Sequence, residues 1–435
     1  MPNRKNDSVM KVFHNPSRSE WAVLSLRPNI NLSKLQPKVQ AVLDEVKNRG
    51  SKALIELTSE FDKVKLESLV LDVPSSVELD LELKAAIDLA WKNIYAFHSA
   101  QQQTPEKVET TPGVFCWRKS VAIEKVGLYI PGGSAPLFST LLMLGIPAKI
   151  ADCKEMVICT PPNKTGTVDA AILYVAQKLG VKQIYTLGGA QAIAAMTFGT
   201  DSIPKVDKIF GPGNQYVTMA KQLAQQQGVA IDMPAGPSEV LVIADESCEP
   251  DFVAADLLSQ AEHGPDSQVI LVVIQSEKVV TEILREVDEQ LSQLPRKDIA
   301  KIALENSSVV VVDSLEEAMA FSNQYAPEHL ILATKNPDEL AEKVVNAGSV
   351  FIGNYSCESA GDYASGTNHT LPTNGYARSY SGVSLDSFVK KVTFQKLSSE
   401  GIQNIGPAIE TMATAERLDA HRNAVSVRLK KLKNG

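Results

Sequence analysis

Strand-like and helix-like segments alternate along this chain from about residue 124 to residue 352, and this alternation constrains the fold more than any other feature. Strands are predicted where β-rich apolar runs occur, at 126–130, 156–160, 183–187, 208–210, 240–244, 269–274, 309–312, 329–333 and 350–352. Apolar stretches with helical spacing separate them. Such alternation is typical of βαβ units and parallel sheets. We therefore expect an α/β fold with two doubly wound, nucleotide-fold-like domains that meet near Pro237.

The segments outside this alternation are predicted to be mainly helical. Two helices joined by a short turn are expected within 38–60 and another over 81–102, from the spacing of their apolar residues. Residues 1–29 form an N-terminal arm and residues 384–435 a helical C-terminal tail. About thirty residues after Gly353 have no periodic pattern and little charge, which favours an ordered loop at a functional site.

Composition excludes several classes of protein. The 435 residues are too many for one core, so two or three domains are expected. The formal net charge of −8 argues against nucleic acid as the main partner, and no apolar run is long enough to cross a membrane. Five scattered cysteines without a C-x-x-C motif, and a start that lacks a secretory signal, indicate reduced thiols in a cytoplasmic protein.

Glu328 and His329 are the first candidates for catalysis. An imidazole ionises near neutral pH, and a neighbouring carboxylate can raise its basicity or orient a water molecule beside it. Successive side chains of a strand point to opposite faces, so the pair can share a site only at the end of an element, and Pro327 provides such an end. An isolated Glu-His dipeptide would be better explained as the start of an ordinary strand.

Other histidines supply a candidate metal site. Gln260 and His263 are three residues apart near the end of a predicted helix, so they leave the same face and can offer oxygen and nitrogen together. Zinc accepts such ligands, and catalytic zinc sites leave positions open. Against this reading, Gln is an uncommon zinc ligand and a Gln-x-x-His pair is more often a helix surface. The remaining candidates lie in the long loop and the tail: Asp362, His369, Glu416 and His421.

Three glycine-rich turns, at 131–134, 188–191 and 211–214, each follow a strand and open a helix. Backbone N–H groups and the helix dipole favour a phosphate at such positions. None is a G-x-G-x-x-G fingerprint, since Tyr216 occupies the third glycine position in the closest match. Each turn alone is as well explained as an ordinary connection, but three together favour a nucleotide.

Seven blocks of this sequence resemble, in order, the signature blocks of the histidinol dehydrogenase family. They are residues 129–133, 188–194, 211–217, 235–239, 260–264, 326–330 and 365–373. The resemblance extends from about residue 20 to the C-terminus, with no departure at a functional position. It implies the last step of histidine biosynthesis, in which NAD oxidises L-histidinol twice, through L-histidinal, to L-histidine.

The resemblance also implies cofactors and residue roles. NAD and one Zn²⁺ per subunit are expected, with His329 as general base and Glu328 activating water. The implied zinc ligands are Gln260, His263, Asp362 and His421. The implied substrate contacts are these four residues together with Ser238, His329, His369 and Glu416. The implied NAD contacts are Tyr129, Gln191 and Asn214.

The family is homodimeric, and its C-terminal segment crosses to the other subunit. The resemblance therefore implies that Glu416 and His421 complete the site of the partner. It also implies that residues 127–237, which carry the NAD contacts, are inserted into a main domain formed by 30–126 and 238–383, which carries the metal and the Glu-His pair.

Three alternatives compete with this interpretation. A cysteine thiolate at Cys116 or Cys153 could serve aldehyde oxidation, but neither has the surroundings that lower a thiol pKa, apart from Lys154 beside Cys153. A zinc-dependent hydrolase would use the same ligands and the Glu-His pair without a dinucleotide. A catalytically silent protein that binds a metal or nucleotide is the non-enzyme alternative.

Overall fold

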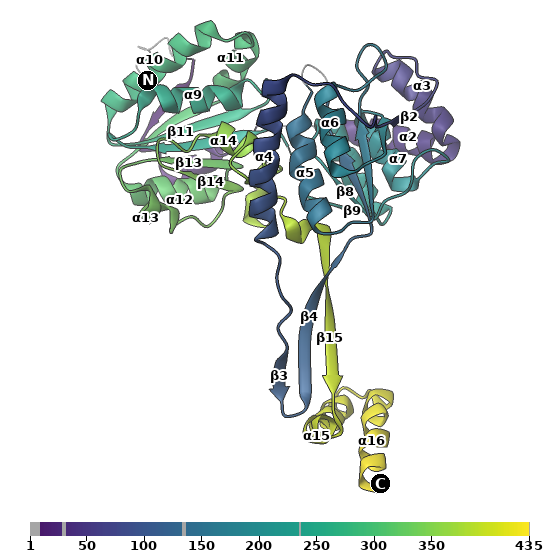
Figure 1. Ribbon diagram of the computed structural model, residues 1–435. Helices are drawn as coiled ribbons and strands as arrows, with labels where there is room; N and C mark the ends of the chain where they lie inside the picture. The colour runs from purple at the N-terminus through teal and green to yellow at the C-terminus, as the bar shows by residue number, and fades with distance from the viewer. Residues whose placement is uncertain (1–8, 28–31, 133–135, 235, 435) are drawn as a thin grey trace.

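Two six-stranded sheets, each covered by helices on both faces, form two α/β units that lie side by side (Figure 1). The computed structural model describes residues 9–27, 32–132, 136–234 and 236–434. Helix α4 (Leu81–Ser99) lies between the two units. No helix in these described ranges combines the length and the apolar character needed to cross a membrane.

The first sheet is parallel throughout and belongs mostly to the second half of the chain. Its strand order is β1 (Lys11–His14), β12 (Ser308–Val312), β11 (Gln268–Ile274), β10 (Glu239–Ala244), β13 (His329–Ala333) and β14 (Ser349–Ile352). One face is covered by α9 (Pro250–Ala261), α10 (Glu277–Gln293) and α11 (Lys297–Glu305). The other face is covered by α1 (Arg18–Leu24), α12 (Leu315–Tyr325) and α13 (Pro337–Ala341). Burial on both faces explains why the central strands are almost wholly apolar.

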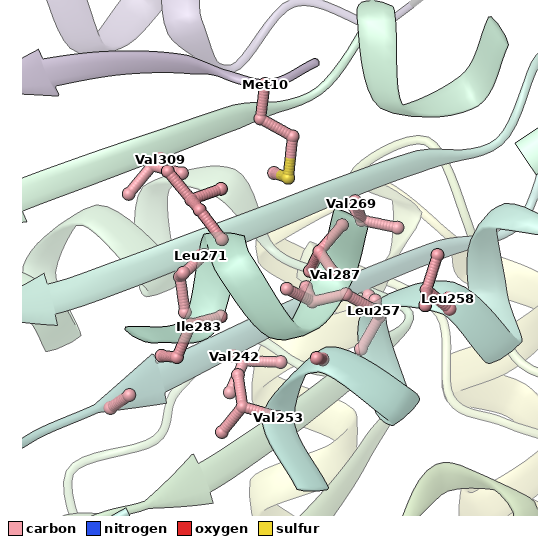
Figure 2. Close-up of a cluster of buried hydrophobic side chains, with 14 of the residues drawn as sticks. Met10, Val242, Val253, Leu257, Leu258, Val269, Leu271, Ile283, Val287 and Val309 are labelled. Carbon is pink, nitrogen blue, oxygen red and sulfur yellow. The ribbon is translucent and has the colours of Figure 1, made fainter. Parts of the chain in front are cut away.

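The N-terminal segment belongs to this core. Met10 is the residue just before β1. Figure 2 shows it in the apolar cluster that includes Val309, Leu271 and residues of α9 and α10. On the opposite face, Trp21 of α1 meets Phe321 edge to face, with ring centroids 5.6 Å apart. The described part of the predicted arm is therefore a strand and a helix of the first unit.

The second sheet contains the other series of strands. Its order is β2 (Val70–Asp72), β7 (Gln183–Thr186), β6 (Glu155–Thr160), β5 (Lys125–Tyr129), β8 (Lys208–Phe210) and β9 (Ala230–Ile231), and only β2 is antiparallel to its neighbour. Its helices on one face are α2 (Leu32–Arg49), α3 (Ser51–Phe61), α7 (Gly189–Phe198) and α8 (Gln215–Gln226). Those on the other face are α4, α5 (Phe138–Ile150) and α6 (Ala170–Leu179).

A long antiparallel stalk extends away from both units (Figure 1). It consists of β3 (Val108–Thr111), β4 (Val114–Ala122) and β15 (Val389–Leu397), and Trp117 stacks on Phe394 across it. The tail helices α15 (Ser399–Ala415) and α16 (Asp419–Asn434) lie at its far end.

The predicted α/β fold with two doubly wound units is confirmed, but its boundaries differ from those expected. We expected residues 30–126 to join 238–383. Instead β2 is an edge strand of the second sheet, and helices α2 to α4 pack on that sheet. The apolar stripe of α2 is buried against α7 and α8. The inserted unit thus begins before α2, not at residue 127. The tail expected to be helical contains strand β15 after a short 3-10 helix at Leu385–Phe388. The patternless stretch after Gly353 contains a short helix, α14 (Glu358–Tyr363).

Candidate active site

Glu328 and His329 lie at the amino end of β13, where the chain leaves α12. Ala326 ends that helix in the left-handed conformation, with φ of 56°, and Pro327 follows. Both side chains are buried, and Glu328 Oε2 lies 3.7 Å from His329 Nδ1. The structure therefore brings the two together at the end of the strand, as the sequence predicted.

The main chain of Glu239, the first residue of β10, holds both members of the pair. Its N–H donates to Glu328 Oε2 at 2.9 Å, and its carbonyl oxygen lies 3.0 Å from His329 Nδ1. A carbonyl oxygen can only accept, so Nδ1 carries the proton and Nε2 keeps its lone pair. His329 Nε2 is buried without a partner among the described residues and lies 3.8 Å from Asp362 Oδ1. The free nitrogen is thus the one available as a base.

Acidic and imidazole ligands gather beside this nitrogen. His263, Glu358 and Asp362 each offer one ligand atom, and these atoms lie within 4.8 Å of one another. Glu358 and Asp362 are four residues apart on α14, so both face the end of α9. Glu358 is 1% exposed, and its carboxylate oxygens have no hydrogen-bond partner within the described ranges, while Oε1 lies 4.0 Å from His329 Nδ1.

Gln260 adds a second buried group without partners. It lies in the last turn of α9, and His263 follows that helix, with its N–H bonded to the Gln260 carbonyl. Gln260 is fully buried, yet neither its side-chain oxygen nor its nitrogen finds a partner in the part of the chain that the structure describes. Buried polar groups are nearly always satisfied, so these orphaned atoms indicate a ligand. Imidazole nitrogen and carboxylate oxygen, which His263, Glu358 and Asp362 supply beside Gln260, are ligands that zinc accepts.

Burial sets the protonation states of the cluster. It raises the pKa of Asp362 to about 7 and the pKa values of Glu328 and Glu358 well above the usual range. It lowers the pKa of His329 to about 3 and that of His369 to about 4. The imidazoles are therefore neutral at pH 7, which is the form that binds metals and accepts protons, and a bound cation would favour the ionised carboxylates.

Sequence reasoning missed Glu358. Its signal was the four-residue spacing to Asp362 within Glu-Ser-Ala-Gly-Asp, which is compatible with one helical turn. Because this stretch lacks an apolar stripe, its sequence favours a loop over a helix.

Two expected substrate residues frame the same region. Ser238 is half-buried and immediately precedes Glu239. His369 Nδ1 lies 2.9 Å from the Asp362 carbonyl, and its Nε2 lies 3.3 Å from Thr140 Oγ1 in the first turn of α5. Since α5 covers the second sheet, the two units meet at the contact between His369 and Thr140.

The expected NAD contacts lie at the carboxyl edge of the second sheet. Tyr129 ends β5, and its hydroxyl accepts from the Gly189 N–H at 3.1 Å. Gln191 is buried in the first turn of α7, while the exposed Asn214 caps α8 by accepting from two backbone N–H groups. Strand order reverses between β5 and β8, and dinucleotides bind doubly wound sheets at such a switch point.

Gly211 shows how closely the backbone is packed at this switch point. Its φ is +130°, and a Cβ there would lie 2.1 Å from the Tyr129 carbonyl oxygen, so no other residue fits without displacement. This turn and the one at 188–191 open helices as predicted. In the turn at 131–134, Gly133 and Ser134 lie outside the described residues.

The structure does not bring every predicted residue to the site within one chain. Glu416 and His421 are exposed at the far end of the stalk, away from α9 and α14 (Figure 1). Cys116 is on stalk strand β4. Cys153 is packed in the core of the second unit, where burial raises its pKa to about 12. Cys153 therefore lacks the character of a nucleophile, and Cys116 is half-buried on the stalk.

Comparison with known proteins gives consistent matches. A family model described as histidinol dehydrogenase matches residues 25–429. A Bacteroides thetaiotaomicron protein named histidinol dehydrogenase is 58% identical over 432 residues, which is 98% of this chain and 100% of that protein. An Arabidopsis thaliana protein named histidinol dehydrogenase, chloroplastic, is 54% identical over 418 residues, covering 95% of this chain and 90% of that one.

Solved structures agree. A crystal structure of histidinol dehydrogenase from Elizabethkingia anophelis matches with a TM-score of 0.95 and 58% identity, covering 99% of this chain and 100% of that one. An acetylating aldehyde dehydrogenase from Geobacillus thermoglucosidasius matches with a TM-score of 0.50 and 13% identity, covering 87% and 94% of the two chains. The second likeness concerns the fold alone.

Proposed function

This chain belongs to the histidinol dehydrogenase family of oxidoreductases, and from that premise we propose that it oxidises L-histidinol to L-histidine through L-histidinal, with NAD as oxidant. The reaction is the last step of histidine biosynthesis. The observation that carries the proposal is the group formed by His263, Glu358 and Asp362, whose ligand atoms lie within 4.8 Å of one another beside the Glu-His pair. Among the described residues, buried atoms of Gln260, His329 and Glu358 without hydrogen-bond partners support it.

Gln260, His263 and Asp362 would hold one Zn²⁺ per subunit, together with His421 of the partner subunit. Glu358 provides a further carboxylate within reach of His263 and Asp362. When bound, the zinc would act as a template that fixes the imidazole and amine of the substrate. Ser238 and His369 line the same region, and Glu416 of the partner subunit would pair with the substrate ammonium.

His329 is the general base in this proposal. Its Nδ1–H is engaged by the Glu239 carbonyl, so Nε2 takes the hydroxyl proton of the alcohol and later the proton of the hydrated aldehyde. Glu328, held by the Glu239 N–H, orients and activates the water that adds to the aldehyde. NAD, held by Tyr129, Gln191 and Asn214, would accept a hydride in each half-reaction.

The position of the tail supports a homodimer with exchanged tails. Apolar side chains remain exposed on the stalk and tail helices, among them Phe394, Met412 and Val427, and a second chain would cover them. The same exchange would carry Glu416 and His421 to a site that a single chain leaves without them.

We also propose a cytoplasmic location, supported by five cysteines that are all free thiols. The Arabidopsis relative is named chloroplastic, so fractionation of the source cells is the appropriate measurement.

One assay tests the proposed function. Two NADH should form per histidinol, and activity should be lost on chelation and restored by zinc. A zinc-dependent hydrolase would form no NADH. A silent binding protein would bind NAD or zinc without turnover, and either result would overturn the proposal.

A further inference from the structure

Arg27 connects the N-terminal segment to the active-site region through its side chain. Its Nε donates to Glu239 Oε1 at 3.0 Å and its Nη2 to Glu239 Oε2 at 2.8 Å, which is a bidentate pairing. The pair is buried, with 10% of the Arg27 side chain and 1% of the Glu239 side chain exposed. Planar pairing of this kind fixes orientation as well as distance.

The same guanidinium also binds the segment that precedes the catalytic pair. Arg27 Nη2 donates to the Tyr325 carbonyl at 2.7 Å, and its Cζ lies 3.7 Å from the centre of the Tyr325 ring. Tyr325 ends α12, three residues before Glu328. Arg27 therefore joins the start of β10 to the turn that leads into β13.

Glu239 connects these contacts to the catalytic atoms. Its side chain faces Arg27, and its main chain donates to Glu328 and accepts from His329. The carboxylate also accepts from the N–H of Asn374, in the segment that follows His369. A small displacement of Glu239 would therefore move both hydrogen bonds of the catalytic pair.

We propose that Arg27 and Glu239 are positioning residues, which fix the amino end of β10 against β13 and so hold His329 Nδ1 and Glu328 in their reactive orientation. This inference rests on the proposed function only in treating Glu328 and His329 as the reacting pair. Buried ion pairs add little net stability but can specify one arrangement, which is the role assigned here.

Kinetics of Arg27 variants test the proposal. Arg27→Met should lower kcat about 10²-fold, the usual effect of misplacing a catalytic group by about 1 Å, while KM for histidinol and NAD stays within about threefold. Arg27→Lys keeps the positive charge but not the planar, bidentate guanidinium, and it should recover part of the lost kcat. Arg49→Met, at an exposed arginine paired with Glu45 and Glu56, is the control and should keep wild-type turnover.

A spectroscopic measurement makes the test independent of turnover. In protein labelled with ¹⁵N-histidine, the imidazole shifts of His329, assigned with His329→Gln, should report a proton fixed on Nδ1. In Arg27→Met they should move towards a tautomer mixture. If wild type does not oxidise histidinol, the proposed function fails, while these spectra still decide the positioning role.

Circular dichroism, zinc content and a second substitution distinguish a loss of folding from a loss of positioning. If Arg27→Met does not fold, Arg27→Lys and Glu239→Gln carry the test, and both should lower kcat with little change in KM. The proposal is wrong if the folded variants keep wild-type kcat and imidazole shifts, or if activity falls only in proportion to the unfolded fraction.

Discussion

The two sheets share a doubly wound topology but place their candidate functional residues at opposite edges. In the second sheet, Tyr129, Gln191 and Asn214 lie at the carboxyl ends of the strands, where helices begin. In the first sheet, the Glu-His pair lies at the amino end of β13, beside the C-terminal end of α9.

The electrostatics of helix ends explains what each edge suits. Helix N-termini present free N–H groups and a positive dipole end, which favour the phosphates of a dinucleotide. Helix C-termini present free carbonyls and a negative dipole end, which favour a cation. The two edges meet where His369 approaches Thr140 and where Asn368 donates to the Met143 carbonyl at 2.6 Å. The contact therefore joins an edge that favours cations to one that favours anions.

The largest effect is expected at the amino edge of the first sheet. His329→Asn removes the free Nε2 and should lower kcat by about 10²–10⁴-fold, the usual contribution of a general base. Zinc content and NAD affinity should be unchanged, because neither depends on this nitrogen. NADH formation at saturating substrate measures the effect, and turnover above a tenth of wild type would contradict the assignment.

Glu358 tests whether the missed carboxylate belongs to the metal site. Glu358→Gln should weaken zinc binding by about 10–100-fold, as loss of a supporting group at a metal site usually does. Competition with a chelator gives the affinity directly. Glu316→Gln, on the exposed surface of α12, is the matched control. Equal zinc affinity in the two variants would remove Glu358 from the site.

The pH dependence of zinc binding follows from Asp362. Burial raises its pKa to about 7, so the metal-free folded protein holds this proton more tightly than the unfolded chain. The contribution of protonated Asp362 to the stability of the metal-free protein is thus complete below about pH 4 and lost as pH rises through 7. Zinc needs the carboxylate, so its affinity should fall by about tenfold per pH unit below 7 and level off above.

Chelator competition at pH 6, 7 and 8 measures this slope. Zinc should also raise Tm more at pH 8 than at pH 6. A slope that survives in Asp362→Asn would show that another group is responsible.

At the opposite edge, Asn214→Ala should have a smaller and different effect. It removes the cap of α8, at a cost of about 1 kcal/mol, and should raise the KM for NAD. The kcat at saturating NAD and the zinc content should stay near wild type. Loss of zinc in this variant would mean that the two edges are not independent.

The smallest effect is expected at Cys153, which belongs to neither edge. Its thiol is buried and its pKa is raised to about 12, so Cys153→Ser should keep turnover within about twofold of wild type. Trapping of a covalent thiohemiacetal on this residue would revive the cysteine mechanism.

Local patterns predicted most of the fold. Helix α10 and strands β8 and β13 have the bounds expected from periodicity, and the turn at Gly50 separates α2 from α3. The pairing of short edge strands was not predictable: β1 and β2 have four and three residues, and their partners lie far along the chain. The stalk was not predicted, because β4 pairs with β15, and the paired residues of these two strands are about 270 positions apart in sequence.

The candidate site was predicted as far as residue type and element ends allow. Glu328 and His329 were found from their place at a strand start, whereas Glu358 needed a helical turn that the apolar pattern does not show. Arg27 gave no signal, because its role depends on a contact with a residue 212 positions away. The position of His421 depends on a second chain, about which periodicity within one chain says nothing.

The pairing of β1 with β12 has a consequence for how the protein is made. Lys11 cannot meet Ser308 until nearly three hundred further residues have left the ribosome, which takes roughly 15–60 s at ordinary rates of translation. The whole inserted unit emerges in that interval and can fold first. Strand β1 must therefore wait for β12, and it is among the last strands of the first sheet to find its place.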